Sequence, residues 1–205
     1  LDGADVTVFC SNDYLGLANH PDVLKAGGGA GSSRLISGNR PVHEALEEQL
    51  SRLYGRPATL FSSGYHANLA LMSTLLTADD VVASDALNHA SIIDGLRLSK
   101  AERIILPHGD PSALPSGAKM AVVEGLYSMD GDVLSLDAYV GEHWLAVDEA
   151  HAFGVLGPEG RGAAADQGLE PDFVVGTLGK AIGAYGAFIV GPQSLRDLLV
   201  SRGRS

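Results

Sequence analysis

A lysine between glycines and an aspartate after an apolar run are the residues of this chain best suited to chemistry. Lys180 lies in Thr-Leu-Gly-Lys-Ala-Ile-Gly (177–183), and Asp148 follows Trp-Leu-Ala-Val (144–147). A lysine amine can form a Schiff base with an aldehyde. A carboxylate can keep a pyridinium nitrogen protonated, so that the ring withdraws electrons. Together they indicate a pyridoxal phosphate (PLP) site, although either residue alone could be an ordinary buried acid or a surface lysine.

Composition places the chain among globular proteins and excludes several partners. It has 205 residues, of which 45% are hydrophobic and 19% charged, enough for one or two domains. Apolar runs stay well below the roughly 20 residues of a membrane span, so we expect no membrane contact. The single cysteine, Cys10, is typical of a reducing cytoplasm and cannot build a thiolate metal site. The net charge of -11 argues against nucleic acid as the main partner.

Short apolar, β-rich runs alternate with helical patterns along the chain. We predict helices over residues 43–54, 67–76 and 91–99. Most of the runs are apolar throughout, which indicates strands buried on both faces of a mainly parallel sheet in an α/β fold. The predicted strands are 58–61, 81–84, 103–106, 119–123, 144–147, 173–176 and 187–190.

Polar residues follow five of these predicted strands. Ligands of open α/β sheets gather beyond the carboxyl ends of the strands, so polar groups that follow the strands should meet on one side of the sheet. The five segments are 62–65, 85–89, 124–128, 148–151 and 177–180.

The segment Ser63-Gly64-Tyr65 precedes a predicted helix, whose first backbone N–H groups suit a phosphate. Thr177, three residues before Lys180, could add a hydroxyl to the same phosphate. Ser63 could instead be a simple helix N-cap.

Four further residues in these segments could contact the cofactor ring. His89 could stack on a pyridine face or be a hydrogen-bonded structural histidine. Ser128 and His151 are candidates for hydrogen bonds to the phenolic oxygen, and Glu124 is a further cofactor-binding candidate.

Several other enzyme classes lack their required motifs. The segment Asp-Glu-Ala-His (148–151) spells a helicase box, but no phosphate-binding loop accompanies it. The chain also lacks a dinucleotide fingerprint and the Gly-x-Ser-x-Gly nucleophile elbow.

The ordered motifs resemble those of the α-oxoamine synthases, which are PLP enzymes of the aspartate-aminotransferase fold (fold type I). The resemblance runs nearly end to end. It implies that residues 41–205 form the PLP-binding large domain and that residues 1–40 carry substrate-entrance and dimer-edge motifs. It also implies that a smaller C-terminal domain is absent from this chain. The motifs are Asn-Asp-Tyr-Leu-Gly-Leu (12–17), Gly-Ser-Ser-Arg-Leu-Ile-Ser-Gly (31–38), Ser-Gly-Tyr-His-Ala-Asn (63–68), Asn-His-Ala-Ser (88–91), Glu-Gly-Leu-Tyr-Ser-Met-Asp-Gly-Asp (124–132), Asp-Glu-Ala-His (148–151) and Thr-Leu-Gly-Lys (177–180).

The chain is most similar to the branch of that family that condenses L-alanine with a pimeloyl thioester in biotin biosynthesis. The resemblance implies that Lys180 holds PLP and then takes the alanine Cα proton. Coenzyme A or acyl carrier protein would leave, and the product would lose carbon dioxide. Asn12, Tyr14 and Arg34 would line the acyl entrance or the edge of a partner subunit in a cytoplasmic homodimer.

Three alternatives stay open at this point. Another branch of the family, such as glycine C-acetyltransferase, shares the PLP motifs. An aminotransferase is a nearby rival among enzymes. A catalytically silent binding protein would be expected to have lost Lys180, Asp148 or His89, and all three are present.

Three connections look short for the crossovers between parallel strands. Such crossovers need a dozen or more residues, usually helical, and proline makes a poor helix interior. Residues 22–31 and 137–143 number fewer than a dozen, and the twelve residues 107–118 include three prolines. Either segments are missing from the chain near 26–29, 114–117 or 140–142, or the protein is a naturally minimal variant.

Overall fold

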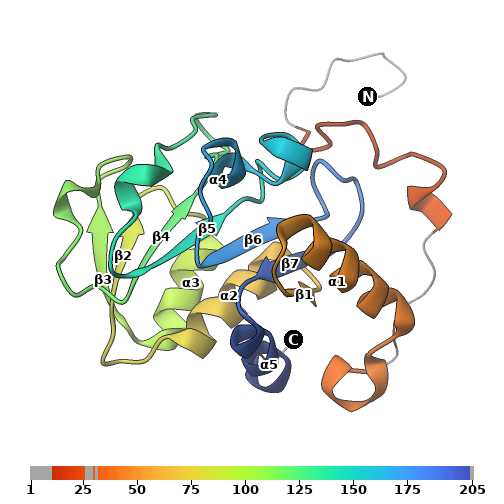
Figure 1. Cartoon of the computed structure of the whole chain (residues 1–205), viewed down its shortest axis with the longest axis horizontal. Helices are drawn as coiled ribbons and strands as arrows, with labels where there is room; N and C mark the ends of the chain where they lie inside the picture. Colours follow the sequence, from red (N-terminus) through yellow and green to blue (C-terminus); the bar gives the residue numbers. More distant parts are fainter. Residues whose placement is uncertain (1–10, 26–29, 31, 204–205) are drawn as a thin grey trace, which may run out of the picture.

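The computed structural model describes residues 11–25, 30 and 32–203. Cys10, the glycines of residues 27–31 and the expected break near 26–29 lie outside the described residues. One seven-stranded sheet forms the centre of the molecule (Figure 1). All seven predicted strands are confirmed, each to within one residue at either end. They are β1 (Ala58–Phe61), β2 (Val81–Asp85), β3 (Glu102–Leu106), β4 (Met120–Glu124), β5 (Trp144–Asp148), β6 (Phe173–Thr177) and β7 (Ala187–Val190).

The strand order is β1-β7-β6-β5-β4-β2-β3, and β7 alone runs antiparallel to its neighbours. The prediction of a mainly parallel sheet is therefore confirmed. The reversal of β7 follows from its connection to β6, because residues 178–186 are too few for a parallel crossover. This loop closes on itself, with the Leu178 N–H donating to the Gly186 carbonyl at 2.9 Å.

The three predicted helices are confirmed, and each begins one to three residues earlier than expected. Two further α-helices, α4 and α5, were not predicted. The α-helices are α1 (Pro41–Tyr54), α2 (Gly64–Leu75), α3 (Ala90–Ser99), α4 (Ala163–Asp166) and α5 (Gln193–Arg202). The short helical turns are η1 (Val23–Lys25), η2 (Arg34–Gly38), η3 (Pro111–Ala113), η4 (Leu136–Tyr139) and η5 (Pro158–Gly160). Among the described residues, no helix is both long and apolar enough to cross a membrane.

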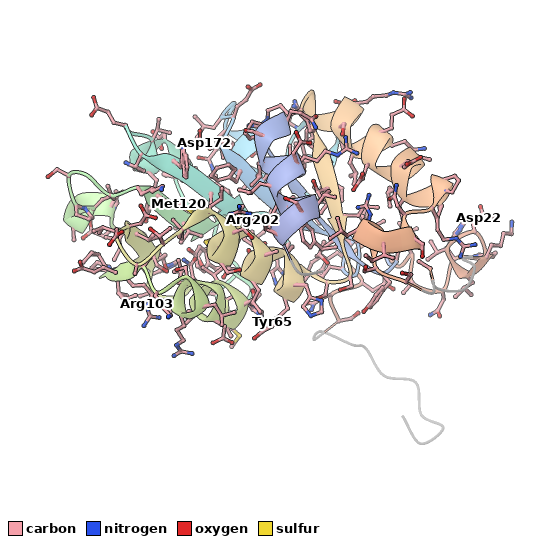
Figure 2. All side chains as sticks on the ribbon, turned by 90° about the horizontal axis from the view of Figure 1, so that it is seen from below. Asp22, Tyr65, Arg103, Met120, Asp172 and Arg202 are labelled. Atoms are coloured by element: carbon pink, nitrogen blue, oxygen red, sulfur yellow. The ribbon has the colours of Figure 1, made fainter. Side chains whose placement is uncertain are left out.

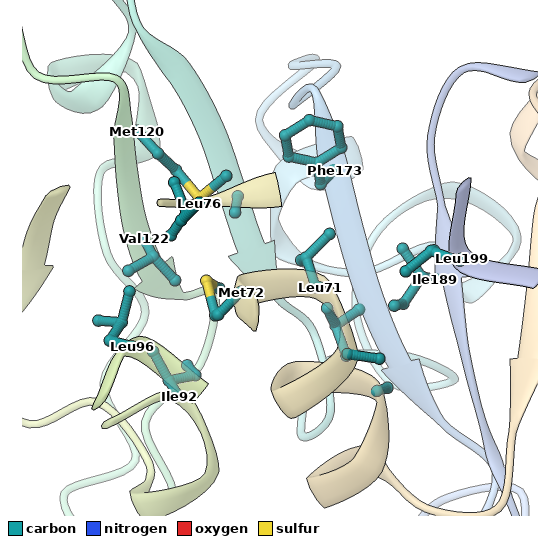
Figure 3. Close-up of a cluster of buried hydrophobic side chains, with 14 of the residues drawn as sticks. Leu71, Met72, Leu76, Ile92, Leu96, Met120, Val122, Phe173, Ile189 and Leu199 are labelled. Atoms are coloured by element: carbon teal, nitrogen blue, oxygen red, sulfur yellow. The ribbon is translucent and has the colours of Figure 1, made fainter. Parts of the chain in front are cut away.

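Helices α2, α3 and α5 cover one face of the sheet (Figures 1 and 2). On that face Met72 and Leu96 pack with Met120 and Val122 of β4 (Figure 3). The alternate β4 residues, 121 and 123, join a second buried cluster with η4 and α4 on the opposite face. Both faces of β4 are covered, which is why all four residues from 120 to 123 are apolar.

Strand β2 lies between β3 and β4, so the chain crosses it to reach β4. The described residues 107–119 make this crossover with a single helical turn, η3, in place of an α-helix. Residues 125–143 join β4 to β5 in the same way, with η4 packing Leu136 and Tyr139 against the sheet. The short connections expected from the sequence therefore still join strands that run parallel, β3 to β4 and β4 to β5.

Gly176 faces Phe188 across the β6–β7 pair, and a Cβ at residue 176 would overlap the Phe188 ring. We predict that Gly176→Ala lowers the free energy of unfolding by about 1–3 kcal/mol, the usual cost of overpacking. Gly179→Ala is the matched control, because the nearest atoms there lie 3.7 Å from an added Cβ. Urea unfolding measures both variants, and equal midpoints would contradict the prediction.

Candidate active site

A cavity of about 170 Å³ opens where five strands end. It collects residues that follow β1, β2, β4, β5 and β6, so the expected meeting of polar groups on one side of the sheet is confirmed. Its lining residues are Gly64, Tyr65, Asn68, His89, Ser91, Glu124, Asp148, Ala150, His151, Thr177 and Lys180.

Lys180 enters the cavity from the β6–β7 loop. Its Nζ lies 2.7 Å from His151 Nε2. Burial lowers the pKa of the Lys180 amine. The Asp148 and Glu124 carboxyl groups act to raise this pKa, but burial outweighs them. A lowered pKa increases the share of free amine, the form that attacks an aldehyde or takes a proton.

His151 joins Lys180 to the N-terminal segment. Its Nδ1 lies 2.7 Å from the Tyr14 hydroxyl, which also lies 3.2 Å from Asn12 Oδ1. Burial, and then the nearby Lys180 and His89, lower the pKa of His151 to about 4. The ring is therefore neutral near pH 7, with one nitrogen free to accept a hydrogen bond. Tyr14 contacts the site through this ring.

Asp148 is a buried carboxylate at the end of β5. Its Oδ2 accepts from Asn68 Nδ2 at 2.7 Å, and its Oδ1 accepts from the Ala150 N–H at 2.9 Å. Asn68 Nδ2 also donates to Ser91 Oγ at 3.0 Å. Asn68 was not among the predicted site residues. Its signal was its position in α2, one helical turn after Gly64, which places both residues on the same side of the helix.

Glu124 ends β4 directly opposite Asp148 in the sheet register. Burial, followed by the Asp148 charge, raises the pKa of Glu124 to about 8. Its Oε1 accepts the backbone N–H of His89. The His89 ring lines the cavity, and its Nδ1 lies 2.7 Å from Ser91 Oγ at the start of α3.

The start of α2 forms the end of the cavity nearest Thr177. Ser63 caps this helix by accepting the His66 N–H at 3.2 Å, as the simpler sequence interpretation allowed. Gly64 faces the Thr177 side chain, and the Thr177 hydroxyl donates to the Gly186 carbonyl at 3.1 Å. Tyr65 lines the cavity with its ring, while its hydroxyl donates to Asp94.

Five predicted site residues are not among those that line this cavity: Asn12, Tyr14, Arg34, Ser63 and Ser128. Ser128 is exposed beyond β4. Arg34 donates to the buried Glu47 and to Asn39, and it lines a separate cavity of about 430 Å³ beside His43. Asn12 and Tyr14 contact each other beside His151, and the roles at the acyl entrance or subunit edge expected of these two residues and of Arg34 stay predictions. Arg34 lies elsewhere because the carboxylate of Glu47 in α1 binds its guanidinium.

A sequence model of the class I and II aminotransferases matches residues 4–205. The chain belongs to this family. It is 47% identical to the 8-amino-7-oxononanoate synthase of Burkholderia thailandensis, in an alignment that covers 100% of the chain and 59% of the relative. The chain thus spans about three fifths of the length of that relative. The alignment extends over 232 positions, 27 more than the 205 residues of the chain.

Solved structures with the same fold include a serine palmitoyltransferase and an 8-amino-7-oxononanoate synthase. Serine palmitoyltransferase from S. paucimobilis, with bound PLP–myriocin, is 35% identical, with a TM-score of 0.85 over 93% of this chain and 56% of that one. The 8-amino-7-oxononanoate synthase of Francisella tularensis is 32% identical, with a TM-score of 0.84 over 96% of this chain and 61% of that one.

The cofactor of this family is PLP, and the residues present fit it. A lysine with a lowered pKa, a buried carboxylate and a helix N-terminus line one cavity. These groups match the aldehyde, ring nitrogen and phosphate in turn. The carbonyl oxygen of Asn68 is buried and lacks a hydrogen-bond partner within the described part of the chain, as expected of a polar cavity that binds a ligand.

Glu124 generates a prediction about pH. Between pH 4.5 and about 8 the folded protein keeps the Glu124 proton while the unfolded chain loses it, so stability should fall as pH rises across this window. Glu124→Gln should remove this fall, because glutamine retains an oxygen for the His89 N–H and has no charge to desolvate. Glu48→Gln, at an exposed site on α1, is the control. Urea unfolding across this pH range is the measurement. A Glu124→Gln slope equal to that of the unchanged protein would refute the assignment.

Proposed function

We propose that this chain is the PLP-binding part of a cytoplasmic α-oxoamine synthase that condenses L-alanine with a pimeloyl thioester, as 8-amino-7-oxononanoate synthases do. The observation that carries the proposal is Lys180 Nζ at 2.7 Å from a neutral His151, in one cavity with the buried Asp148. The names of the relatives and the likeness to these two solved structures support the reaction class.

The binding roles follow from the lining of the cavity. PLP, when bound, supplies an aldehyde and an electron-withdrawing ring. Asp148, fixed by Asn68 and the Ala150 N–H, would hold a proton at the ring nitrogen. His89 would cover one face of the ring. The first N–H groups of α2 and the Thr177 hydroxyl would bind the phosphate.

Lys180 would then act as the base at the Cα of L-alanine. Its lowered pKa brings the amine closer to the operating pH, which favours proton transfer in both directions. His151 accepts a hydrogen bond from the protonated amine or donates one to the free amine, depending on which nitrogen carries its proton. The cavity therefore holds a proton at Lys180 without leaving it unpaired.

We further propose that the protein acts as a homodimer through residues 12–14 and 34–38. Leu35, Ile36 and Val42 are exposed apolar side chains close together along the chain, at 61%, 77% and 66% exposure. Contiguous exposed apolar residues commonly mark an interface between subunits.

The decisive experiment measures free thiol released by the purified chain with PLP. L-Alanine with pimeloyl-CoA or a pimeloyl acyl carrier protein should release thiol faster than glycine with acetyl-CoA or serine with palmitoyl-CoA. A faster glycine reaction would point to the glycine C-acetyltransferase branch. Pyruvate formation from L-alanine and a keto acid, without thiol release, would indicate an aminotransferase. Absence of turnover with bound PLP would support the silent binding protein.

Lys180 should be the point of covalent cofactor attachment. Borohydride reduction of the protein with PLP should label the peptide that contains Lys180, and Lys180→Ala should remove the label and the visible absorbance. Lys119→Ala is the control, since this lysine pairs with Asp80 where β4 and β2 begin, at the strand ends away from the cavity. Peptide mass spectrometry reads the label. Retention of the label in Lys180→Ala would exclude this lysine as the anchor.

A further inference from the structure

His108 lies between two carboxylates, outside the cavity described above. Its Nδ1 is 2.9 Å from Asp85 Oδ1, and its Nε2 is 2.8 Å from Asp132 Oδ2. A carboxylate only accepts hydrogen bonds, so an imidazole can bond to both carboxylates only when both of its nitrogens carry hydrogen. With both aspartates ionised, this geometry requires a charged His108.

The surroundings of His108 favour that charge. Burial acts to lower the pKa of its ring, but Asp85 and Asp132 outweigh burial and raise the pKa above its usual value. Asp85 comes from β2 and Asp132 from the loop after β4. The Tyr127 ring stands edge-on at a centroid distance of 4.6 Å. Asp110, two residues further along, turns its carboxylate to the Ser112 N–H instead.

Asp85 connects His108 to the loop that bears His89. Besides the imidazole, its carboxylate accepts the Leu87 N–H at 2.8 Å and the Gly109 N–H at 3.0 Å. This residue is buried, and its charge is satisfied by these three donors together. Of these three donors only the His108 ring carries a charge. If His108 lost its positive charge, Asp85 would be held less strongly, and so would residues 86–89 that follow it.

Asp132 connects His108 to the loop after β4. In that loop the Tyr127 hydroxyl accepts the Glu124 N–H at 3.1 Å and donates to Asn88 Oδ1 at 3.1 Å. Residues 85–89 and residues 125–132 are therefore joined twice. Tyr127 bonds directly to Asn88, and His108 bridges Asp85 and Asp132. Glu124 closes the connection by accepting the His89 N–H.

We propose that His108 is a positioning residue: as an imidazolium it holds residues 85–89 against residues 125–132 and thereby sets the positions of His89 and Glu124 at the cavity. The pairing itself is a property of the protein without cofactor. It rests on the proposed function only where His89 is said to cover the PLP ring.

The first test needs no substitution. In protein labelled with ¹⁵N-histidine, both His108 nitrogens should be protonated at pH 7, and the His89 signals should shift with the His108 inflection. An inflection of His108 at or below the ordinary 6.5 would overturn the proposal. So would a His89 signal that does not respond when His108 titrates. Both outcomes are independent of whether PLP binds or turns over.

The second test uses PLP affinity measured by fluorescence titration. His108→Gln and Asp132→Asn should each weaken PLP binding about tenfold, as removal of outer hydrogen-bond partners does at metal sites. PLP affinity of the unchanged protein should fall as pH rises through the His108 pKa, because the imidazolium is then lost. His108→Gln should lack this inflection, and Asp132→Asn should move it to lower pH, because His108 then keeps only the Asp85 carboxylate.

The control is His143→Gln, directly before β5 begins, where the histidine bonds to the Tyr139 carbonyl. It should leave both affinity and pH profile unchanged. Thermal unfolding of each variant separates a local from a global effect. If His108→Gln does not fold, Asp132→Asn and the ¹⁵N titration decide. An affinity inflection at unchanged pH in folded Asp132→Asn, or one retained in folded His108→Gln, would refute the proposal.

Discussion

The candidate site depends on keeping one buried negative charge, that of Asp148, satisfied. Burying a carboxylate is costly unless hydrogen-bond donors or positive groups face it. Asn68 and the Ala150 N–H supply the donors, and the nearby Lys180 supplies a positive charge when protonated. Burial, followed by the same Asp148 charge, raises the pKa of the neighbouring Glu124 to about 8, so Glu124 keeps its proton below that pH.

The hydrogen bonds of Asp148 extend into a wider arrangement. Asn68 also binds Ser91, and Ser91 binds the His89 ring, so α2, α3 and β5 share one polar chain. Each of these side chains is buried or partly buried, where hydrogen bonds are stronger and unpaired groups are more costly. The orientation of His89 is consequently set from the ring side by Ser91 and from the backbone side by Glu124.

Sequence patterns predicted the sheet well because most strands are buried on both faces and read as apolar runs; the edge strand β3 is mostly exposed. The polar segments after those runs located Lys180, Asp148 and His151 for the same reason, since strand direction fixes where a segment ends. Patterns did not predict α4, which is only four residues long, or α5, whose face toward the protein buries just Leu195 and Leu199. The ion pair between Arg34 and Glu47 was not predicted, because nothing in the order of residues shows that they meet.

The antiparallel strand β7 has a consequence for ligand choice. Ala187 pairs with Phe61 of β1 on one side and with Thr177 of β6 on the other. The amide groups at the start of α2 follow β1, and the amine of Lys180 follows β6, so one strand fixes the span between them. A sheet held by backbone hydrogen bonds on both sides of β7 has little freedom to stretch. In the proposed function, this span would select the ligand by its length. A ligand whose anionic end and carbonyl end are spaced differently would reach either the α2 amides or the Lys180 amine, but not both.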